Sequence, residues 1–156
     1  MPRKIDALLA EYGESHQNPL NKAVHWVCVP IIAWTVLALI HEVPVPSALA
    51  ALAYFNWLNL TLVLVLIYYL IMSWRLAIGF AVFAALCLWL VQIYPQHFDR
   101  PLWQTALGLF VLAWIGQFWG HKVEGKKPSF FKDIQFLLIG PAWLLHFIYQ
   151  RVGLAY

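Results

Sequence analysis

Charged residues are scarce in this chain of 156 residues: Asp, Glu, Lys and Arg together make up only 11% of it. Soluble domains carry about 25% charged residues, and a domain of this size keeps much of its surface in contact with solvent. Because 63% of the residues are hydrophobic, the composition excludes an ordinary soluble fold. We therefore expect one integral-membrane domain over residues 1–156.

Other signals are absent as well. No apolar core follows the basic residues at the start before Asp6, so this segment is not a secretory signal peptide. The two cysteines, Cys28 and Cys87, lie in separate apolar stretches, which indicates buried small hydrophobes rather than a disulfide. The sequence has no HxxHH box, no HExxH motif and no internal repeat, and we expect no nucleic-acid partner.

Four apolar stretches predict an all-α, polytopic helix bundle, since a spanning helix needs about 20 mostly apolar residues. They cover about residues 21–40, 48–70, 76–94 and 102–121. Asn18 and Pro19 are a good start signal for the first helix. Pro30 lies within it, where a membrane helix is expected to kink without breaking.

The chain after residue 128 allows two interpretations. It forms either one span from Phe130 to Gln150, or an interfacial helix to Leu138 followed by a short membrane-entering helix. The second is favoured because Gly140-Pro141 is a strong helix break and polar residues precede it. The bundle then has four to five membrane-embedded helices plus an N-terminal and an interfacial helix.

Basic residues mark one side of this bundle. If the helices alternate in direction, the chain start, the turn near residue 73 and the end of the fourth span lie together. That side collects Arg3, Lys4, Lys22, Arg75, Lys122, Lys126, Lys127 and Lys132. The other side has Arg100 and, on this topology, Arg151. The positive-inside rule then places the N-terminus in the cytoplasm.

Six histidines stand out because ionisable groups near hydrocarbon are costly and are usually functional. His41 and His97 fall in loops on the far side, where we expect them to be solvated. The cytoplasmic end holds three others and, if a short helix begins near Pro141, a fourth. Neutral imidazoles around one point suit Fe, Zn, Cu or Ni. The predicted metal ligands are His16, His25, His121 and His146.

Two segments, YGESHQNPLNKAVHWVCVP (12–30) and QFWGHKVEGKKPSFFKDIQFLLIGP (117–141), strongly resemble the Mpo1-like family. The layout matches over nearly the whole chain. The matching features are Tyr12, His16, Asn18-Pro19, Asn21-Lys22, His25, Pro30, Gln117-Phe118, Gly120-His121, Glu124 and Lys127-Pro128.

This resemblance implies an Fe(II)-dependent dioxygenase that shortens long-chain 2-hydroxy fatty acids by one carbon with O2, in fatty acid α-oxidation. His16, His25 and His121 would be its catalytic histidines, and zinc can replace iron in the purified protein. The yeast members act in the endoplasmic reticulum, whereas this compact chain resembles a bacterial, inner-membrane member. It departs from the eukaryotic family pattern at two positions. In that pattern the acid after the second-motif histidine comes one residue later than Glu124 does here, and the last helix tends to carry a Glu where this chain has His146.

Polar neighbours of the predicted site are assigned supporting roles. Asn21, Gln117 and Glu124 are expected to orient the imidazoles. The lysines are placed either to attract the substrate carboxylate or to meet anionic lipid head groups. They are Lys122, Lys126 and Lys127.

Two alternatives remain open at this point. A haem protein would use two helix histidines such as His25 and His146 as axial ligands. A non-catalytic lipid-binding scaffold would use the histidines as hydrogen-bonding groups between helices. The oligomeric state is not indicated by the sequence.

Overall fold

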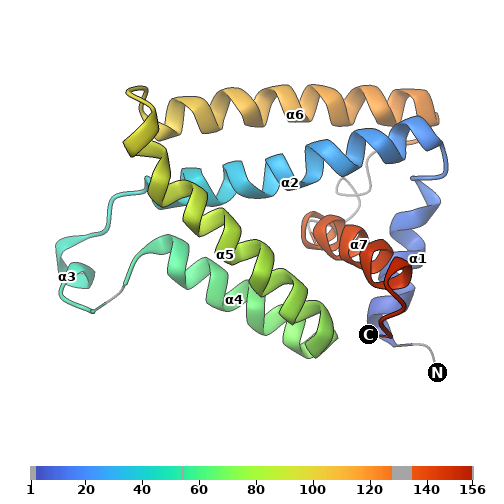
Figure 1. Ribbon diagram of the computed structural model, residues 1–156, viewed down its shortest axis with the longest axis horizontal. Coiled ribbons are helices and arrows are strands. Elements are labelled where there is room, and N and C mark those ends of the chain that lie inside the picture. Colours follow the sequence, from blue (N-terminus) through green and yellow to red (C-terminus); the bar gives the residue numbers. More distant parts are fainter. Residues whose placement is uncertain (1–2, 54, 128–134, 156) are drawn as a thin grey trace.

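The computed structural model describes residues 3–53, 55–127 and 135–155, and these residues form helices and loops without a strand (Figure 1). Three helices are long and apolar enough to cross a membrane: α2 (Pro19–His41), α5 (Trp74–His97) and α6 (Leu102–Glu124). They confirm the predicted all-α membrane bundle. Each begins within a few residues of its predicted start.

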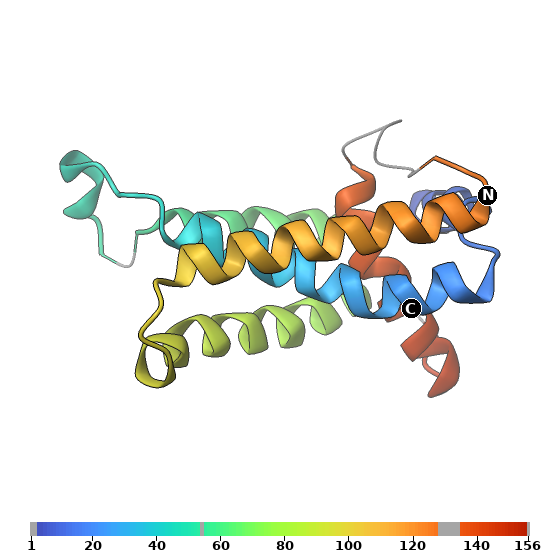
Figure 2. The ribbon, with the colours of Figure 1, turned by 90° about the horizontal axis from the view of Figure 1, so that it is seen from above.

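Helices α2 and α6 lie side by side along their length (Figures 1 and 2). The side chain of Asn18 caps α2 by accepting a hydrogen bond of 2.9 Å from the Leu20 amide, and the helix continues through Pro30. Glycine allows close contact further along, since a Cβ at Gly116 would lie 2.9 Å from the Cys28 sulfur. This pairing holds the start of α2 against the end of α6.

The second predicted span begins later than expected. A short helix, α3 (Ser47–Ala50), lies at its expected start, and α4 runs only over Trp57–Met72. Asn56 sets this start, because its side chain accepts a hydrogen bond of 2.7 Å from the Asn59 amide. At 16 residues α4 is about 24 Å long, which is shorter than the hydrocarbon core of a bilayer.

The prediction that the helix breaks at Gly140-Pro141 is wrong. Helix α7 (Phe136–Arg151) passes through both residues and includes residues 136–138, where the predicted interfacial helix was to end. The part of that predicted helix before residue 135 lies outside the described residues. Tertiary packing stabilises the helix here in spite of the Gly-Pro pair. Ile139 and Ala142 are fully buried, and the Tyr69 hydroxyl donates a hydrogen bond of 2.5 Å to the Leu138 carbonyl.

Helices α1 (Lys4–Glu14) and α7 cross the direction of the long helices at the end where α2 begins (Figures 1 and 2). The chain end lies there too, since Arg75 donates a hydrogen bond to the Ala155 carbonyl. This contact places Arg151 at the same end of the bundle as Arg75. The alternating topology had predicted Arg151 at the opposite end.

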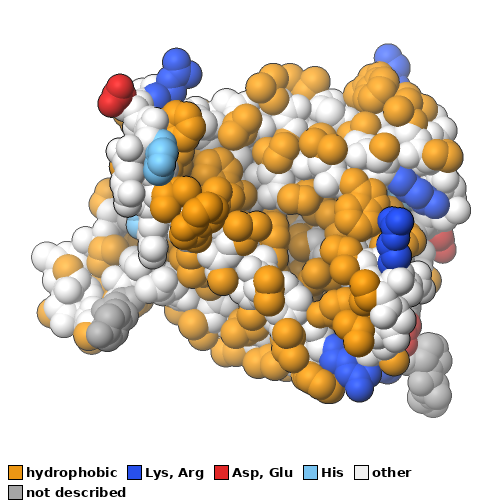
Figure 3. All heavy atoms as spheres, in the orientation of Figure 1, with side chains coloured by type: hydrophobic (Ala, Val, Ile, Leu, Met, Phe, Trp, Pro, Cys, Tyr) orange, Lys and Arg blue, Asp and Glu red, His pale blue; other side chains and the backbone are white. Residues whose placement is uncertain are grey.

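Large apolar side chains are spread over the face of the bundle seen in Figure 3. Ile71, Val82 and Leu112 are between 65% and 78% exposed. Exposed apolar area of this extent would be unstable in water. It indicates a surface in contact with lipid.

Candidate metal centre

Three histidines from three separate segments meet at the crossed end of the bundle. His16 lies in the turn after α1, His25 lies two turns into α2, and His121 lies in the last turn of α6. All three are buried, with at most 4% of each residue exposed. One nitrogen from each ring lies within 4.8 Å of the others, which suits binding to a single metal ion.

Hydrogen bonds to the backbone fix the tautomers of two of these rings. His16 Nδ1 lies 2.6 Å from the Tyr12 carbonyl, and His25 Nδ1 lies 2.9 Å from the Asn21 carbonyl. A carbonyl only accepts, so both Nδ1 atoms carry the proton when the rings are neutral. Both Nε2 atoms then present lone pairs, as metal-binding imidazoles do.

These two Nε2 atoms are 2.8 Å apart. Two bare nitrogen lone pairs at this distance repel each other unless a cation lies between them. Two nitrogens bound to one metal at about 2.1 Å and at right angles are themselves about 3 Å apart. The spacing therefore fits the donor set of a metal ion.

The third ring completes the set. The His121 ring centroid lies 4.9 Å from that of His16 and 5.0 Å from that of His25. Its Nδ1 is buried and makes no hydrogen bond to any described residue. An unsatisfied buried nitrogen is costly, and a metal ion is one partner that removes this cost.

Aromatic rings surround this site and exclude water from it. The ring of Tyr12 stacks on His16 at 4.1 Å, and Trp143 of α7 lies 5.2 Å from the same imidazole. Burial, reinforced by the neighbouring His25, lowers the pKa of His16 to about 3. His16 is therefore neutral at physiological pH, which is the form that binds metals.

Glu124 joins the segments that carry the histidines. One carboxylate oxygen accepts from the Gln17 amide at 2.8 Å, and the other accepts from the Asn18 amide at 2.8 Å and the Asn21 side chain at 3.2 Å. Both oxygens thus face backbone and side-chain donors of the turn between α1 and α2. This geometry fits the predicted supporting role of Glu124 rather than a metal ligand.

Asn21 and Gln117 also lie where a supporting role was predicted. Asn21 is fully buried and holds His25 through its carbonyl, while its side chain donates a hydrogen bond of 3.1 Å to the Ser15 carbonyl. Gln117 is 5% exposed, and its side chain interacts with the His25 imidazole.

Other predicted residues are not brought to the site. His146 of α7 contacts the ring of Phe147 and interacts electrostatically with Asp6, so it is outside the group of three. The His25–His146 pairing expected for a haem is therefore not formed. The predicted substrate-binding lysines are exposed, and Lys126 donates a hydrogen bond of 2.6 Å to the Glu14 carbonyl.

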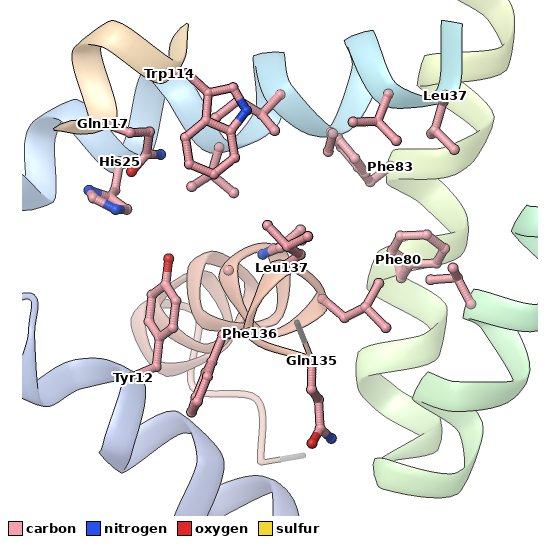
Figure 4. A pocket seen from close by; sticks show the side chains of 18 of the residues that line it. Tyr12, His25, Leu37, Phe80, Phe83, Trp114, Gln117, Gln135, Phe136 and Leu137 are labelled. Atoms are coloured by element: carbon pink, nitrogen blue, oxygen red, sulfur yellow. The ribbon is translucent and has the colours of Figure 1, made fainter. Parts of the chain in front are cut away.

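A cavity of about 480 Å³ begins at this site (Figure 4). Tyr12, His25, Gln117 and His121 line it at the metal end. Further away its wall is apolar, with Phe80 and Phe83 among the lining residues. Its volume lies within the usual range of ligand pockets, about 300–1,000 Å³.

Tyr12 is a residue of the site whose role was not predicted from the sequence. Its carbonyl holds His16, its ring stacks on that imidazole, and its side chain lines the cavity. The available signal was its spacing, because a residue four positions before His16 lies on the same face of a helix. The cavity itself had no sequence signal, since six helices contribute to its wall.

Comparison with known proteins gives two matches. The model of the family described as 2-hydroxy-palmitic acid dioxygenase Mpo1-like matches residues 3–152. A protein of Saccharomyces cerevisiae described as 2-hydroxy-palmitic acid dioxygenase MPO1 is 27% identical over 147 residues, which cover 93% of this chain and 79% of that protein. No solved structure matches significantly.

Proposed function

Because this chain belongs to the Mpo1-like family, we propose that it is a membrane-embedded, Fe(II)-dependent dioxygenase that shortens 2-hydroxy fatty acids by one carbon. The main support is the convergence of three buried imidazoles at one end of an apolar cavity. A long-chain 2-hydroxy acid has a matching shape, with a carboxylate and a hydroxyl at one end of an apolar chain. The yeast relative is named for such a substrate.

In this proposal His16, His25 and His121 hold the iron. Bound iron would supply the activation of O2 and a chelating site for the carboxylate and the 2-hydroxyl of the substrate. The carbonyls of Tyr12 and Asn21 keep two imidazoles in the orientation and tautomer that present Nε2. The apolar wall of the cavity holds the acyl chain away from water.

The proposed reaction breaks the bond between C1 and C2. One 2-hydroxy acid and one O2 give the acid one carbon shorter, CO2 and water, so that O2 is the only oxidant required. The cavity orients the chain so that C1 and C2 lie at the histidine end and the methyl end lies among the phenylalanines.

We further propose that the histidine end faces the cytoplasm of a bacterial inner membrane. The helix ends at this side carry basic residues, a distribution that the positive-inside rule associates with the cytoplasm. Arg3 precedes α1, Lys22 and Arg75 lie in the first turns of α2 and α5, and Lys122 lies in the last turn of α6. A green fluorescent protein fused to the chain end beside Arg75 is expected to fluoresce. An active alkaline phosphatase fusion at that position would instead show the opposite orientation.

The enzymatic proposal is tested with detergent-purified protein loaded with Fe(II) without oxygen. Exposure to air with 2-hydroxyhexadecanoic acid should yield pentadecanoic acid, measured by mass spectrometry. The same preparation stripped with a chelator, and then loaded with zinc, should give none. Stoichiometric iron without any shortened acid would reject the dioxygenase, and no bound metal at all would favour the lipid-binding scaffold.

A further inference from the structure

The hydroxyl of Tyr12 differs from the other two hydroxyls, those of Thr61 and Tyr69, among the described residues that line the cavity. Tyr12 is only 7% exposed, and Figure 4 shows its hydroxyl directed into the cavity, on the side of His25 and Gln117. It makes no hydrogen bond to any residue in the described part of the chain. A polar group that is buried without a partner is unfavourable, which indicates a partner supplied by a ligand.

The other two hydroxyls on this wall have partners within the protein. The Tyr69 hydroxyl donates to the Leu138 carbonyl at 2.5 Å, and the Thr61 hydroxyl donates to the Trp57 carbonyl at 2.8 Å. Gln135 donates to the Tyr68 hydroxyl at 2.5 Å. Tyr12 lies nearest the histidines of the two tyrosines on this wall, since its ring stacks on His16.

The charges on the cavity wall restrict the class of ligand that can bind there. Among the described residues, no lysine or arginine lines the cavity, and Lys122, Lys126 and Lys127 near the site are exposed. An acidic headgroup here would meet a neutral phenol, the Gln117 amide and the metal that the three histidines are proposed to hold. The remaining wall suits a single unbranched alkyl chain.

We propose that Tyr12 is a substrate-binding residue whose hydroxyl donates a hydrogen bond to a headgroup oxygen of an acyl-chain carboxylic acid. The identity of this ligand class rests on the proposed function. The same residue then holds both the ligand and, through its carbonyl, the His16 imidazole. Tyr12 thereby fixes the headgroup relative to the metal.

Tyr12→Phe removes only the hydroxyl and keeps the stacking and the carbonyl. Tyr69→Phe is the matched control, because it makes the same change on the same cavity wall at a hydroxyl that already has a protein partner. Both variants are reconstituted in nanodiscs with zinc bound and titrated with radiolabelled hexadecanoic acid and with hexadecane. The metal content of each is measured alongside.

A hydrogen bond to a charged group is worth enough to predict a Kd for hexadecanoic acid about tenfold higher or more in Tyr12→Phe. Hexadecane binding and zinc content should match the wild type. Tyr69→Phe should show reduced thermal stability and an unchanged ratio of acid to hydrocarbon affinity. The inference is overturned if Tyr12→Phe binds the acid normally, or loses acid and hydrocarbon equally.

This outcome is separate from that of the proposed function. Tyr12-dependent binding of the acid without any turnover of 2-hydroxyhexadecanoic acid would reject the dioxygenase and keep the headgroup site. Turnover with the same KM in wild type and Tyr12→Phe would keep the dioxygenase and reject the role of Tyr12.

Discussion

The two ends of the bundle each carry histidines, yet only one end forms a site. His97 at the far end has the same local hydrogen bond as His16 and His25: its Nδ1 lies 3.0 Å from the carbonyl four residues earlier. His97 and His41 are nevertheless exposed, and neither belongs to a metal-binding group among the described residues. A hydrogen bond to the carbonyl four residues earlier is therefore enough to orient an imidazole. A set of metal-binding nitrogens also requires that histidines from separate segments come together and are buried.

The largest expected effect comes from removing a histidine at each end. His121→Ala should lower the affinity for iron by at least about 100-fold and abolish product formation, since one of three proposed ligands is lost. His97→Ala should bind iron and turn over substrate like the wild type. Iron per protein is measured by mass spectrometry of the purified variants after gel filtration.

A His121→Ala protein with full iron content would show that the buried histidines only pack against each other. A loss of iron in His97→Ala would show that the far end contributes to the site. Either result would contradict the conclusion that only one end of the bundle forms a metal site.

A smaller effect is expected at Glu124, which binds no metal itself in this arrangement. Glu124→Gln replaces one oxygen by a donor that faces the amides of Gln17 and Asn18, so the turn that carries His16 should loosen. Residues that hold ligands in place typically contribute 10- to 100-fold to metal affinity, and we expect a loss of about this size.

Glu42→Gln at the far end of α2 is the control and should leave metal affinity unchanged. The visible spectrum of the cobalt-substituted protein reports the geometry of the metal ligands. It distinguishes a change in that geometry from a general loss of stability. An unchanged spectrum in Glu124→Gln would contradict the positioning role.

Acid should destabilise the metal-free protein through the histidine end of the bundle. His16 has a pKa of about 3 in the fold, against an ordinary value of 6.5, because burial disfavours its charged form. Between these two values the unfolded chain binds more protons, so stability is full above about pH 6.5 and falls as the pH drops towards 3. The melting temperature should decrease over this window.

The matched variants are His16→Gln and His97→Gln. The first should flatten part of the pH dependence of the melting temperature, and the second should leave it as in the wild type. Equal slopes in all three proteins would mean that burial of His16 does not control the acid sensitivity.

The long helices could be predicted from sequence because their signals are local. Apolar length, the Asn18-Pro19 start and the change to charged residues near Glu124 each act within a few residues. The start of α4 was missed although Asn56 is a good cap, because the apolar residues before it continued the hydrophobic pattern.

The site was only partly predictable for a different reason. Alternating topology was enough to bring His16, His25 and His121 to one end, and the family resemblance pointed to the same three. The position of His146 depends on how α7 crosses the bundle, which is decided by burial of residues such as Ile139 and Trp143 against other helices. No local signal carries that information.

The smallest expected effect tests how tightly each end is packed, through two glycines of α6. A Cβ at Gly120 would lie 2.5 Å from Oδ1 of Asn21, whose side chain is held by Ser15 and Glu124. Gly120→Ala should therefore destabilise the protein by about 1–3 kcal/mol, as overpacking usually does.

A Cβ at Gly108, nearer the far end, would meet nothing within 4 Å. Gly108→Ala should stabilise the helix slightly, by up to about 1 kcal/mol, because alanine favours helix more than glycine does. The melting temperatures of the two variants should thus move in opposite directions. Equal shifts would mean that the histidine end is packed no more tightly than the far end, and that its burial reflects the surrounding aromatic rings alone.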